Sequence, residues 1–316
     1  MHSDQQTHAE REISSQPECW RQAVELASDP GAADGGPDPL PAPGERVAVL
    51  GCGTSWFMAQ SYAALRERGG FGETDAYATS EFPIGRRYDR VVAISRSGTT
   101  SEVLQALRDL AGAVPTVAIT ADPRTPVRQA ADRLVVLDFA DERSVVQTRF
   151  ATSVLALLRT HLGEDLSTAI ADVERAVTEP LPDAVLSDAE LARRQFTFLG
   201  GGWTVGLANE AALKMREASL SWTEAYPAME YRHGPISITD QNSVVWALGE
   251  VPDDLLPDVE ATGATMVHTP DTDPLAELAR IQRLAVLLGQ RKGLDPDNPR
   301  NLTRSVVLER RGEELA

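Results

Sequence analysis

The sequence predicts an α/β protein with a mainly parallel, doubly wound sheet. Short β-branched runs alternate with helical patterns from residue 46 onward, and the alternation restarts in the second half of the chain. A strand that runs parallel to its predecessor needs a crossover connection, usually a helix. The alternation is therefore typical of βαβ units.

The first half supplies the elements of one such sheet. Each predicted strand is a short run rich in Val, Ile, Leu or Thr, and each predicted helix shows a helical apolar period. The predicted strands are Val47–Leu50, Val91–Ile94, Thr116–Thr120 and Leu134–Phe139. The predicted helices are Trp56–Arg68, Ser101–Leu110, Thr125–Ala131 and Val146–Leu162. A short helix near Cys19–Ala27 and a Pro/Gly-rich connector over 28–45 precede them.

The second half repeats this pattern at an offset of about 150 residues. The turn after Val49-Leu50 has a counterpart after Phe198-Leu199, and the next two strands have counterparts in Val244–Ala247 and Thr265–Asp271. We interpret the repeat as an internal duplication, with coincidence among apolar strands as the alternative. We expect an N-terminal helix and linker over 1–45, a first domain over 46–165, a helical connector over 166–190 and a second domain over 191–316.

Composition limits the partners and the location of the protein. With 47 acidic and 30 basic residues the net charge is −17, which argues against nucleic acid or an anionic membrane as a partner. No apolar stretch approaches the ~18 residues of a membrane span, and Met1–Glu25 lacks the core of a signal peptide. Cys19 and Cys52 are too few for a disulfide framework or a zinc site. We expect a cytoplasmic protein without a metal.

The segment Ser95–Thr100 is the strongest candidate for a binding site. Four hydroxyls and a glycine follow the run Val91–Ile94 and precede a predicted helix. Unpaired N–H groups at a helix N-terminus attract anions, and Ser and Thr add donors, so the pattern fits phosphate. An ordinary N-cap is the alternative. The second half has Leu248–Pro252 at this place, with an acid and a proline, which favours a specific site in the first half.

The glycine turn at residues 51–56 does not fit a nucleotide. It lacks the last glycine of G-x-G-x-x-G, because Trp56 stands there, and the chain contains no G-x-x-x-x-G-K-[ST] loop. We expect Thr54 and Ser55 to lie at the same sheet edge as Ser95–Thr100 and to share one crevice with it.

Ionisable side chains gather in the second half. Glu210, Lys214 and Glu217 are spaced for one face of a helix. His233 follows in a Gly-Pro turn, within a predicted loop that also carries Glu224, Tyr226 and Glu230. A solvated face and a structural histidine are the alternatives. Together the groups offer a carboxylate base, a lysine and an imidazole.

These motifs resemble those of the double sugar-isomerase (SIS) domain proteins. That family includes the isomerase half of glucosamine-6-phosphate synthase and stand-alone sugar-phosphate isomerases and deaminases. The resemblance covers nearly the whole chain from Arg11 onward. Its signatures are Gly51–Ser55, Ser95–Thr100, Asn209–Glu217 with Glu224–Tyr226 and His233–Pro235, and Lys292–Asp295 with Pro299–Thr303. It implies two tandem SIS domains, each with a five-stranded sheet, and a homodimer.

The resemblance also implies roles for matched residues at the phosphate end. The phosphate of a sugar 6-phosphate would be held by a set of six residues from the two hydroxyl-rich turns. These are Ser95, Arg96, Ser97, Thr100, Thr54 and Ser55. The sugar itself would be contacted by Cys52, Gly53, Val145, Gln147 and Glu210.

At the reacting end, the resemblance makes Glu217 the base that moves a proton between C1 and C2. His233 would open the sugar ring and would be donated by the neighbouring subunit. Lys214 would line the same pocket, and Lys292 would correspond to a lysine of the C-terminal tail that closes over the substrate. No metal or redox cofactor is implied.

The resemblance thus implies an enzyme of hexose or amino-hexose 6-phosphates. The favoured reaction converts glucosamine 6-phosphate into fructose 6-phosphate and ammonia; simple aldose–ketose isomerisation and a non-catalytic sugar-phosphate-binding regulator are the alternatives. Arg96, Thr99 and Gln147 depart from the synthase pattern, which usually has Gln, Glu and Ser there. Because only 45 residues precede the predicted first domain and residue 2 is His2, we expect no glutaminase activity.

Overall fold

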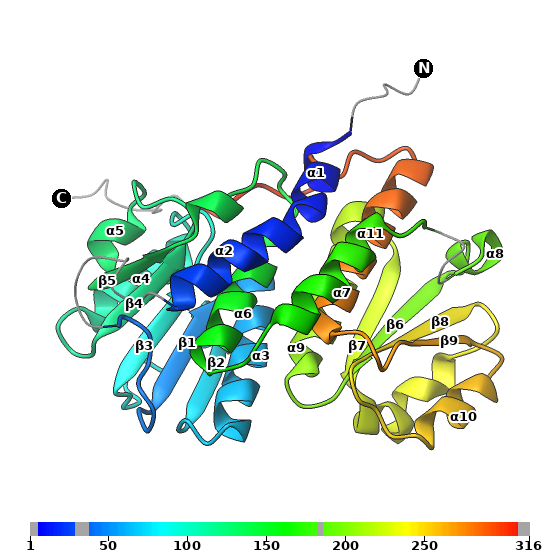
Figure 1. Ribbon diagram of the computed structural model, residues 1–316, viewed down its shortest axis with the longest axis horizontal. Helices are drawn as coiled ribbons and strands as arrows, with labels where there is room; N and C mark the ends of the chain where they lie inside the picture. The colour runs from blue at the N-terminus through cyan, green and yellow to red at the C-terminus, as the bar shows by residue number, and fades with distance from the viewer. Residues whose placement is uncertain (1–5, 29–37, 182–185, 309–316) are drawn as a thin grey trace, which may run out of the picture.

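The computed structural model describes residues 6–28, 38–181 and 186–308 and contains two sheets side by side, each flanked by helices (Figure 1). The first sheet has five strands in the order β2-β1-β3-β4-β5. The second has four described strands in the order β7-β6-β8-β9. All pairs are parallel, which confirms the predicted α/β class. The expectation of five strands in the second sheet is wrong for the described residues.

Helices cover both faces of the first sheet, which consists of β1 (Val47–Gly51), β2 (Thr74–Ala78), β3 (Arg90–Ile94), β4 (Thr116–Thr120) and β5 (Arg133–Val136). The helices are α3 (Thr54–Arg68), α4 (Ser101–Leu110), α5 (Val127–Ala130) and α6 (Arg149–His161). Apolar side chains of α3 and α6 pack on one face, and those of α4 and α5 pack on the other. The first sheet is therefore doubly wound, as the sequence predicts.

The second sheet is covered in the same way. It consists of β6 (Gln195–Gly200), β7 (Trp222–Pro227), β8 (Ser243–Leu248) and β9 (Thr265–His268). Helices α9 (Thr204–Ser219) and α11 (Pro274–Arg291) pack on one face, and α10 (Leu255–Glu260) with the 3-10 segment Ala228–His233 packs on the other. In chain order, its strands occupy the same places as β1 to β4 of the first sheet.

The remaining helices join the two halves into one core. They are α1 (His8–Ser14), α2 (Gln16–Ser28), α7 (Ser167–Thr178) and the short α8 (Asp188–Leu191). Helix α2 packs on α6, α7 packs on α11, and side chains from both sheets share one apolar cluster. No helix among the residues described is long and apolar enough to cross a membrane.

Two strands were not predicted, and both lie at the edge of a sheet. Strand β2 has the sequence Thr-Asp-Ala-Tyr-Ala, and β7 has Trp-Thr-Glu-Ala-Tyr-Pro. An edge strand is paired on one side only and tolerates charges and proline, so it lacks the continuous apolar run of a central strand. The loop expected around Glu224 and Tyr226 is therefore wrong, because both residues lie in β7.

Helices α3 and α9 approach each other closely, and this contact brings the two halves of the candidate site together. A Cβ atom at Gly206 would lie 2.4 Å from the carbonyl oxygen of Phe57 and 2.4 Å from the Oγ of Ser61. A glycine is needed there because any side chain would push the helices apart. The first turn of α3 consequently reaches the middle of α9.

Candidate functional site

The hydroxyl loop, Ser95–Thr100, lies between the end of β3 and the start of α4. Gly98 has a φ of +60°, and a Cβ atom there would lie 2.0 Å from the Oγ1 of Thr125, so the turn requires glycine. Thr100 occupies the N-cap position of α4, yet its side chain makes no capping hydrogen bond. This geometry weakens the ordinary N-cap interpretation, because the hydroxyl is not used by its own helix.

Several donors of the hydroxyl loop have no partner among the described residues. The Oγ of Ser95 is buried and makes no hydrogen bond. The backbone N–H groups of Ser97 and Thr100 also make none within the described part of the chain. Buried donors are nearly always satisfied in folded proteins, so these donors make the loop a candidate anion site.

The C-terminal segment 304–308, here called the tail strap, lies against this loop. The Ser101 N–H donates to the carbonyl oxygen of Val306 at 3.1 Å, and the Leu308 N–H donates to the Oγ of Ser101 at 2.8 Å. The Oγ of Ser305 lies 3.1 Å from that of Ser97. The tail strap thus packs against the hydroxyl loop. The sequence did not predict this contact, because the matched tail motif ends at Thr303.

Arg96 points into the protein interior. Its guanidinium is buried, lies 3.2 Å from the Glu142 carboxylate and donates to the carbonyl oxygens of Ser144, Val145 and Arg304. Glu142 also accepts hydrogen bonds from Thr148. These contacts occupy Arg96 with protein acceptors, so its side chain holds the loop and the tail strap in place. Its Nε is buried without a partner among the described residues, so the phosphate contact predicted for Arg96 stays a prediction that rests on this one donor.

The ionisable residues of α9 form a buried cluster. The Nζ of Lys214 lies 2.5 Å from the Oε2 of Glu217 and 3.3 Å from the Oε1 of Glu210, and it donates to the Oγ1 of Thr54 at 3.0 Å. Thr54 in turn donates to Glu210 at 3.2 Å. Glu210 and Lys214 are fully buried, whereas the Glu217 side chain keeps 17% exposure. The solvated-face alternative is wrong for these three residues.

The cluster is electrostatically unbalanced, because one ammonium faces two carboxylates. Burial raises the pKa of Glu210 to about 7, with repulsion from Glu217 adding to it and Lys214 opposing it. For Lys214 burial alone would lower the pKa, but the two carboxylates together raise it above its ordinary value. Lys214 therefore stays charged, and Glu210, the carboxyl without solvent contact, takes up a proton more readily than an ordinary glutamate.

This imbalance predicts a pH-dependent stability. A carboxyl with a raised pKa stabilises the fold below its ordinary pKa of 4.5, and that contribution is lost as the pH rises through about 7. Between those values the unmodified protein should lose about 3 kcal/mol of unfolding free energy relative to Glu210→Gln, which does not titrate. Urea unfolding of both proteins at several pH values measures the difference, and parallel curves would contradict it.

Glu217 borders a cavity of about 190 Å³ at the end of α9. The opposite wall is the segment that follows α11 and includes Asp295, Asn298 and Arg300. Downstream of this wall, the chain continues as the tail strap to the hydroxyl loop. Strands β1 and β3 pair, so Thr54 and Ser95 follow neighbouring strands at one sheet edge. The Lys214 cluster, through Thr54, and the hydroxyl loop thus lie at the same sheet edge.

His233 is exposed and does not join the cluster within one chain. It ends the 3-10 segment Ala228–His233, and Gly234 follows with a φ of +139°. Across the described ranges His233 makes no hydrogen bond or ion pair. Met229 and Ile238, on either side of it in the sequence, are 57% and 55% exposed.

Lys292 lies elsewhere, at the end of α11. Its Nζ donates to the carbonyl oxygen of Ser219 at 2.8 Å and to the Oγ of Ser221 at 2.9 Å. Burial lowers its pKa. The ammonium therefore caps the C-terminus of α9, where helix carbonyls lack partners. This arrangement gives Lys292 a structural role next to the cluster and not a contact with Glu217.

The residues predicted to contact the sugar are divided between the core and the site edge. Cys52 is half-buried, and Gly53, with a φ of +55°, is exposed at the turn before Thr54. Val145 accepts from Arg96 through its carbonyl oxygen. The Oε1 of Gln147 is buried without a partner among the described residues, so it is available to a donor on a ligand. Ser55 is buried in the first turn of α3.

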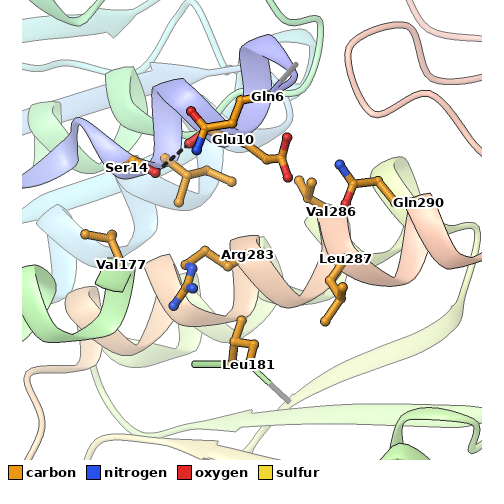
Figure 2. A pocket seen from close by; sticks show the side chains of 10 residues that line it. Gln6, Glu10, Ser14, Val177, Leu181, Arg283, Val286, Leu287 and Gln290 are labelled. Carbon is orange, nitrogen blue, oxygen red and sulfur yellow. Dashed lines mark hydrogen bonds between the residues drawn. The ribbon is translucent and has the colours of Figure 1, made fainter. Parts of the chain in front are cut away.

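A second hollow, of about 240 Å³, lies between α1, α7 and α11 (Figure 2). Glu10 and Ser14 reach it from α1, and Arg283 and Gln290 reach it from α11. Arg283 is already held by the carbonyl oxygens of Ala176 and Glu179 at the end of α7. None of the predicted site residues lines this hollow, so we treat the hollow as distinct from the candidate site at Glu217.

The SIS domain family matches residues 42–160, which contain all five strands of the first sheet and the hydroxyl loop. The SIS domain therefore contributes Thr54 and the hydroxyl loop to the candidate site. The second sheet, which contributes Glu217 and Lys214, lies beyond the matched residues.

Relatives extend the comparison to both sheets. The chain is homologous to the isomerizing glutamine-fructose-6-phosphate aminotransferase of Sulfolobus acidocaldarius, with 29% identity over 296 residues, 84% of this chain and 50% of the relative. It spans about half the length of the curated relatives that it matches.

Two solved structures share the fold. Glucosamine-6-phosphate deaminase from Thermotoga maritima has a TM-score of 0.78 at 23% identity, covering 96% of this chain and 100% of that one. The C-terminal domain of glucosamine-fructose-6-phosphate aminotransferase from Francisella tularensis has a TM-score of 0.79 at 22% identity, covering 95% and 100%. Both alignments cover nearly the whole chain, so the two-sheet arrangement is shared and extends beyond the SIS domain.

Proposed function

We propose that this protein is a sugar-phosphate isomerase or deaminase that moves a proton between C1 and C2 of a hexose or amino-hexose 6-phosphate. The observation that supports this best is the Lys214–Glu217 pair, in which Glu217 borders a cavity and Lys214 contacts Thr54, at the same sheet edge as a loop with unused anion donors. A site that only senses a phosphate needs the loop but not a carboxylate and an ammonium at its other end.

The favoured reaction is the conversion of glucosamine 6-phosphate and water into fructose 6-phosphate and ammonia. The names of the T. maritima deaminase and of the homologous aminotransferase support an amino-sugar phosphate. Simple aldose–ketose isomerisation is the second candidate. A non-catalytic binding protein is the third, and the Glu217 carboxylate, which keeps some solvent contact beside a charged Lys214, argues against it.

The residue types suit this chemistry. The Glu217 carboxylate would remove the proton from C2 and return it to C1 on the same face of the sugar. The Lys214 ammonium would stabilise the negative charge that develops on oxygen in between, and it does so best because it is buried. The phosphate, held by the hydroxyl loop, would supply binding energy that positions the carbons at Glu217. Arg96 would act by holding the loop.

We further propose two tandem SIS domains and a homodimer in which His233 serves the site of the neighbouring subunit. The matching strand order of the two sheets supports the duplication. The exposure of His233, flanked in sequence by exposed Met229 and Ile238, supports its burial against a second copy.

One experiment separates the candidate functions. The purified protein is incubated separately with glucosamine 6-phosphate and glucose 6-phosphate, while ammonia and fructose 6-phosphate are measured and light scattering gives the mass in solution. Ammonia with fructose 6-phosphate supports the deaminase, and fructose 6-phosphate from glucose 6-phosphate supports the isomerase. Tight binding of one compound without turnover of either would reject the enzyme in favour of the binding protein.

A further inference from the structure

The hydroxyl of Ser305 lies among three hydroxyls of the loop that we propose as the phosphate site. Its Oγ lies 3.1 Å from the Oγ of Ser97, 3.0 Å from the Oγ1 of Thr99 and 3.5 Å from the Oγ1 of Thr100. Ser305 is 205 residues beyond Thr100 in the sequence, so this contact comes from the return of the tail strap.

The tail strap is held independently of Ser305. Arg96 donates to the carbonyl oxygen of Arg304 at 2.9 Å, and Ser101 bonds both Val306 and Leu308. These contacts fix the backbone on both sides of the serine. A Ser305→Ala change removes the hydroxyl and leaves the hydrogen bonds that place the tail strap.

The Ser305 hydroxyl can also serve as a donor to a ligand. Ser97 donates to its oxygen, and the single proton of the Thr99 hydroxyl is shared between the oxygens of Ser97 and Ser305, which both lie 3.0 Å from the Thr99 Oγ1. Its own proton can turn toward any of the three neighbouring hydroxyl oxygens or toward a ligand, because a hydroxyl rotates to suit its partners. A phosphate oxygen beside it would receive a better hydrogen bond, because bonds to a charged acceptor are shorter and stronger.

The tail strap and an anion would use different donors of the loop. The tail strap takes the Ser101 N–H, whereas the Ser95 hydroxyl and the N–H groups of Ser97 and Thr100 remain without partners among the described residues. A phosphate held by these groups leaves the bonds of the tail strap intact. The geometry therefore favours a tail strap that stays in place when the anion binds.

We propose that Ser305 is a further phosphate-binding residue and that the tail strap completes the phosphate site. This inference rests on the proposed function in one respect, namely that the hydroxyl loop is the phosphate site. The matched motifs place all phosphate contacts in the first domain. The proposal adds one contact from the C-terminal tail.

The test is calorimetric titration of inorganic phosphate into the full chain, its Ser305→Ala variant and a control. Val307→Ala is the matched control, because Val307 lies on the same tail strap, is 65% exposed and makes no side-chain hydrogen bond. We expect Ser305→Ala to weaken the Kd for phosphate about tenfold or more, which is the loss of one hydrogen bond to a charged group. Val307→Ala should bind like the unmodified protein.

A melting curve separates binding from folding. Without phosphate, Ser305→Ala should melt at the temperature of the unmodified protein, and the rise that phosphate causes should be smaller. Unchanged or tighter phosphate binding by Ser305→Ala would overturn the proposal, as would an unmodified protein that binds no phosphate. A different result would reject the proposed function alone. In that case phosphate binding would depend on Ser305, but the protein would turn over no sugar phosphate.

Discussion

Replacing Glu217 with Gln is expected to lower the turnover of the sugar phosphate by at least about 100-fold, while the affinity for phosphate changes little. A positioned general base contributes about 10²- to 10⁴-fold to a rate, and an amide cannot take up the proton. The Gln oxygen still accepts a hydrogen bond from Lys214, whose Nζ lies 2.5 Å from the present carboxylate. The measurement is kcat with the active sugar phosphate, together with the Kd for inorganic phosphate.

Glu25→Gln is the matched control for this change. Glu25 is exposed on α2, makes no ion pair in the described structure, and loses the same charge when it is replaced. It should keep both turnover and phosphate affinity. If Glu217→Gln lost turnover and phosphate affinity to the same degree, Glu217 would be a binding residue and the base would have to be another group.

Replacing Lys214 with Met is expected to have the largest effect on stability. The change leaves Glu210, which is fully buried, without its cation, and breaking a buried ion pair in this way costs about 3–5 kcal/mol. Met has a similar volume, so the loss reports the uncompensated charge more than a cavity. Urea unfolding at pH 8, where Glu210 is mainly ionised in the unmodified protein, measures the change.

The double variant Lys214→Met with Glu210→Gln tests the cause. It removes the orphaned charge as well as the lysine, so it should recover most of the lost unfolding free energy. A double variant as unstable as Lys214→Met alone would place the effect in packing. If Lys214→Met alone lost less than about 1 kcal/mol of unfolding free energy, the buried ion pair would stabilise the fold no more than an ion pair at the surface does.

Much of the fold could be predicted because central strands and amphipathic helices have strong periodic patterns. The helix Ser101–Leu110 and the strand Thr116–Thr120 have the bounds that the sequence indicates. The edge strands β2 and β7 could not be found in the same way, since one exposed edge removes the demand for apolar residues. The missed β7 also led to the wrong assignment of Glu224 to a loop.

The site was predictable where chemistry is concentrated in a short motif. The grouping of Glu210, Lys214 and Glu217 on one face is confirmed, but helical spacing alone does not reveal whether a face is buried. Arg96 was assigned to phosphate because of its neighbours in the sequence, whereas Glu142, 46 residues away, decides where it points. Ser305 was missed for the same reason, because its partners are separated from it by most of the chain.

Helix α1 meets Asp297, far along the chain, and this contact affects when the tail strap can be placed. Asp297 accepts hydrogen bonds from the N–H groups of His8 and Ala9, both at 2.8 Å, and its carbonyl oxygen accepts from the N–H of Val145. A contact across 289 residues closes only after the segments between have been made and ordered. A chain on the ribosome that still lacks residues 297–308 can therefore build both sheets and the Lys214 cluster, whereas the tail strap is added only with these last described residues.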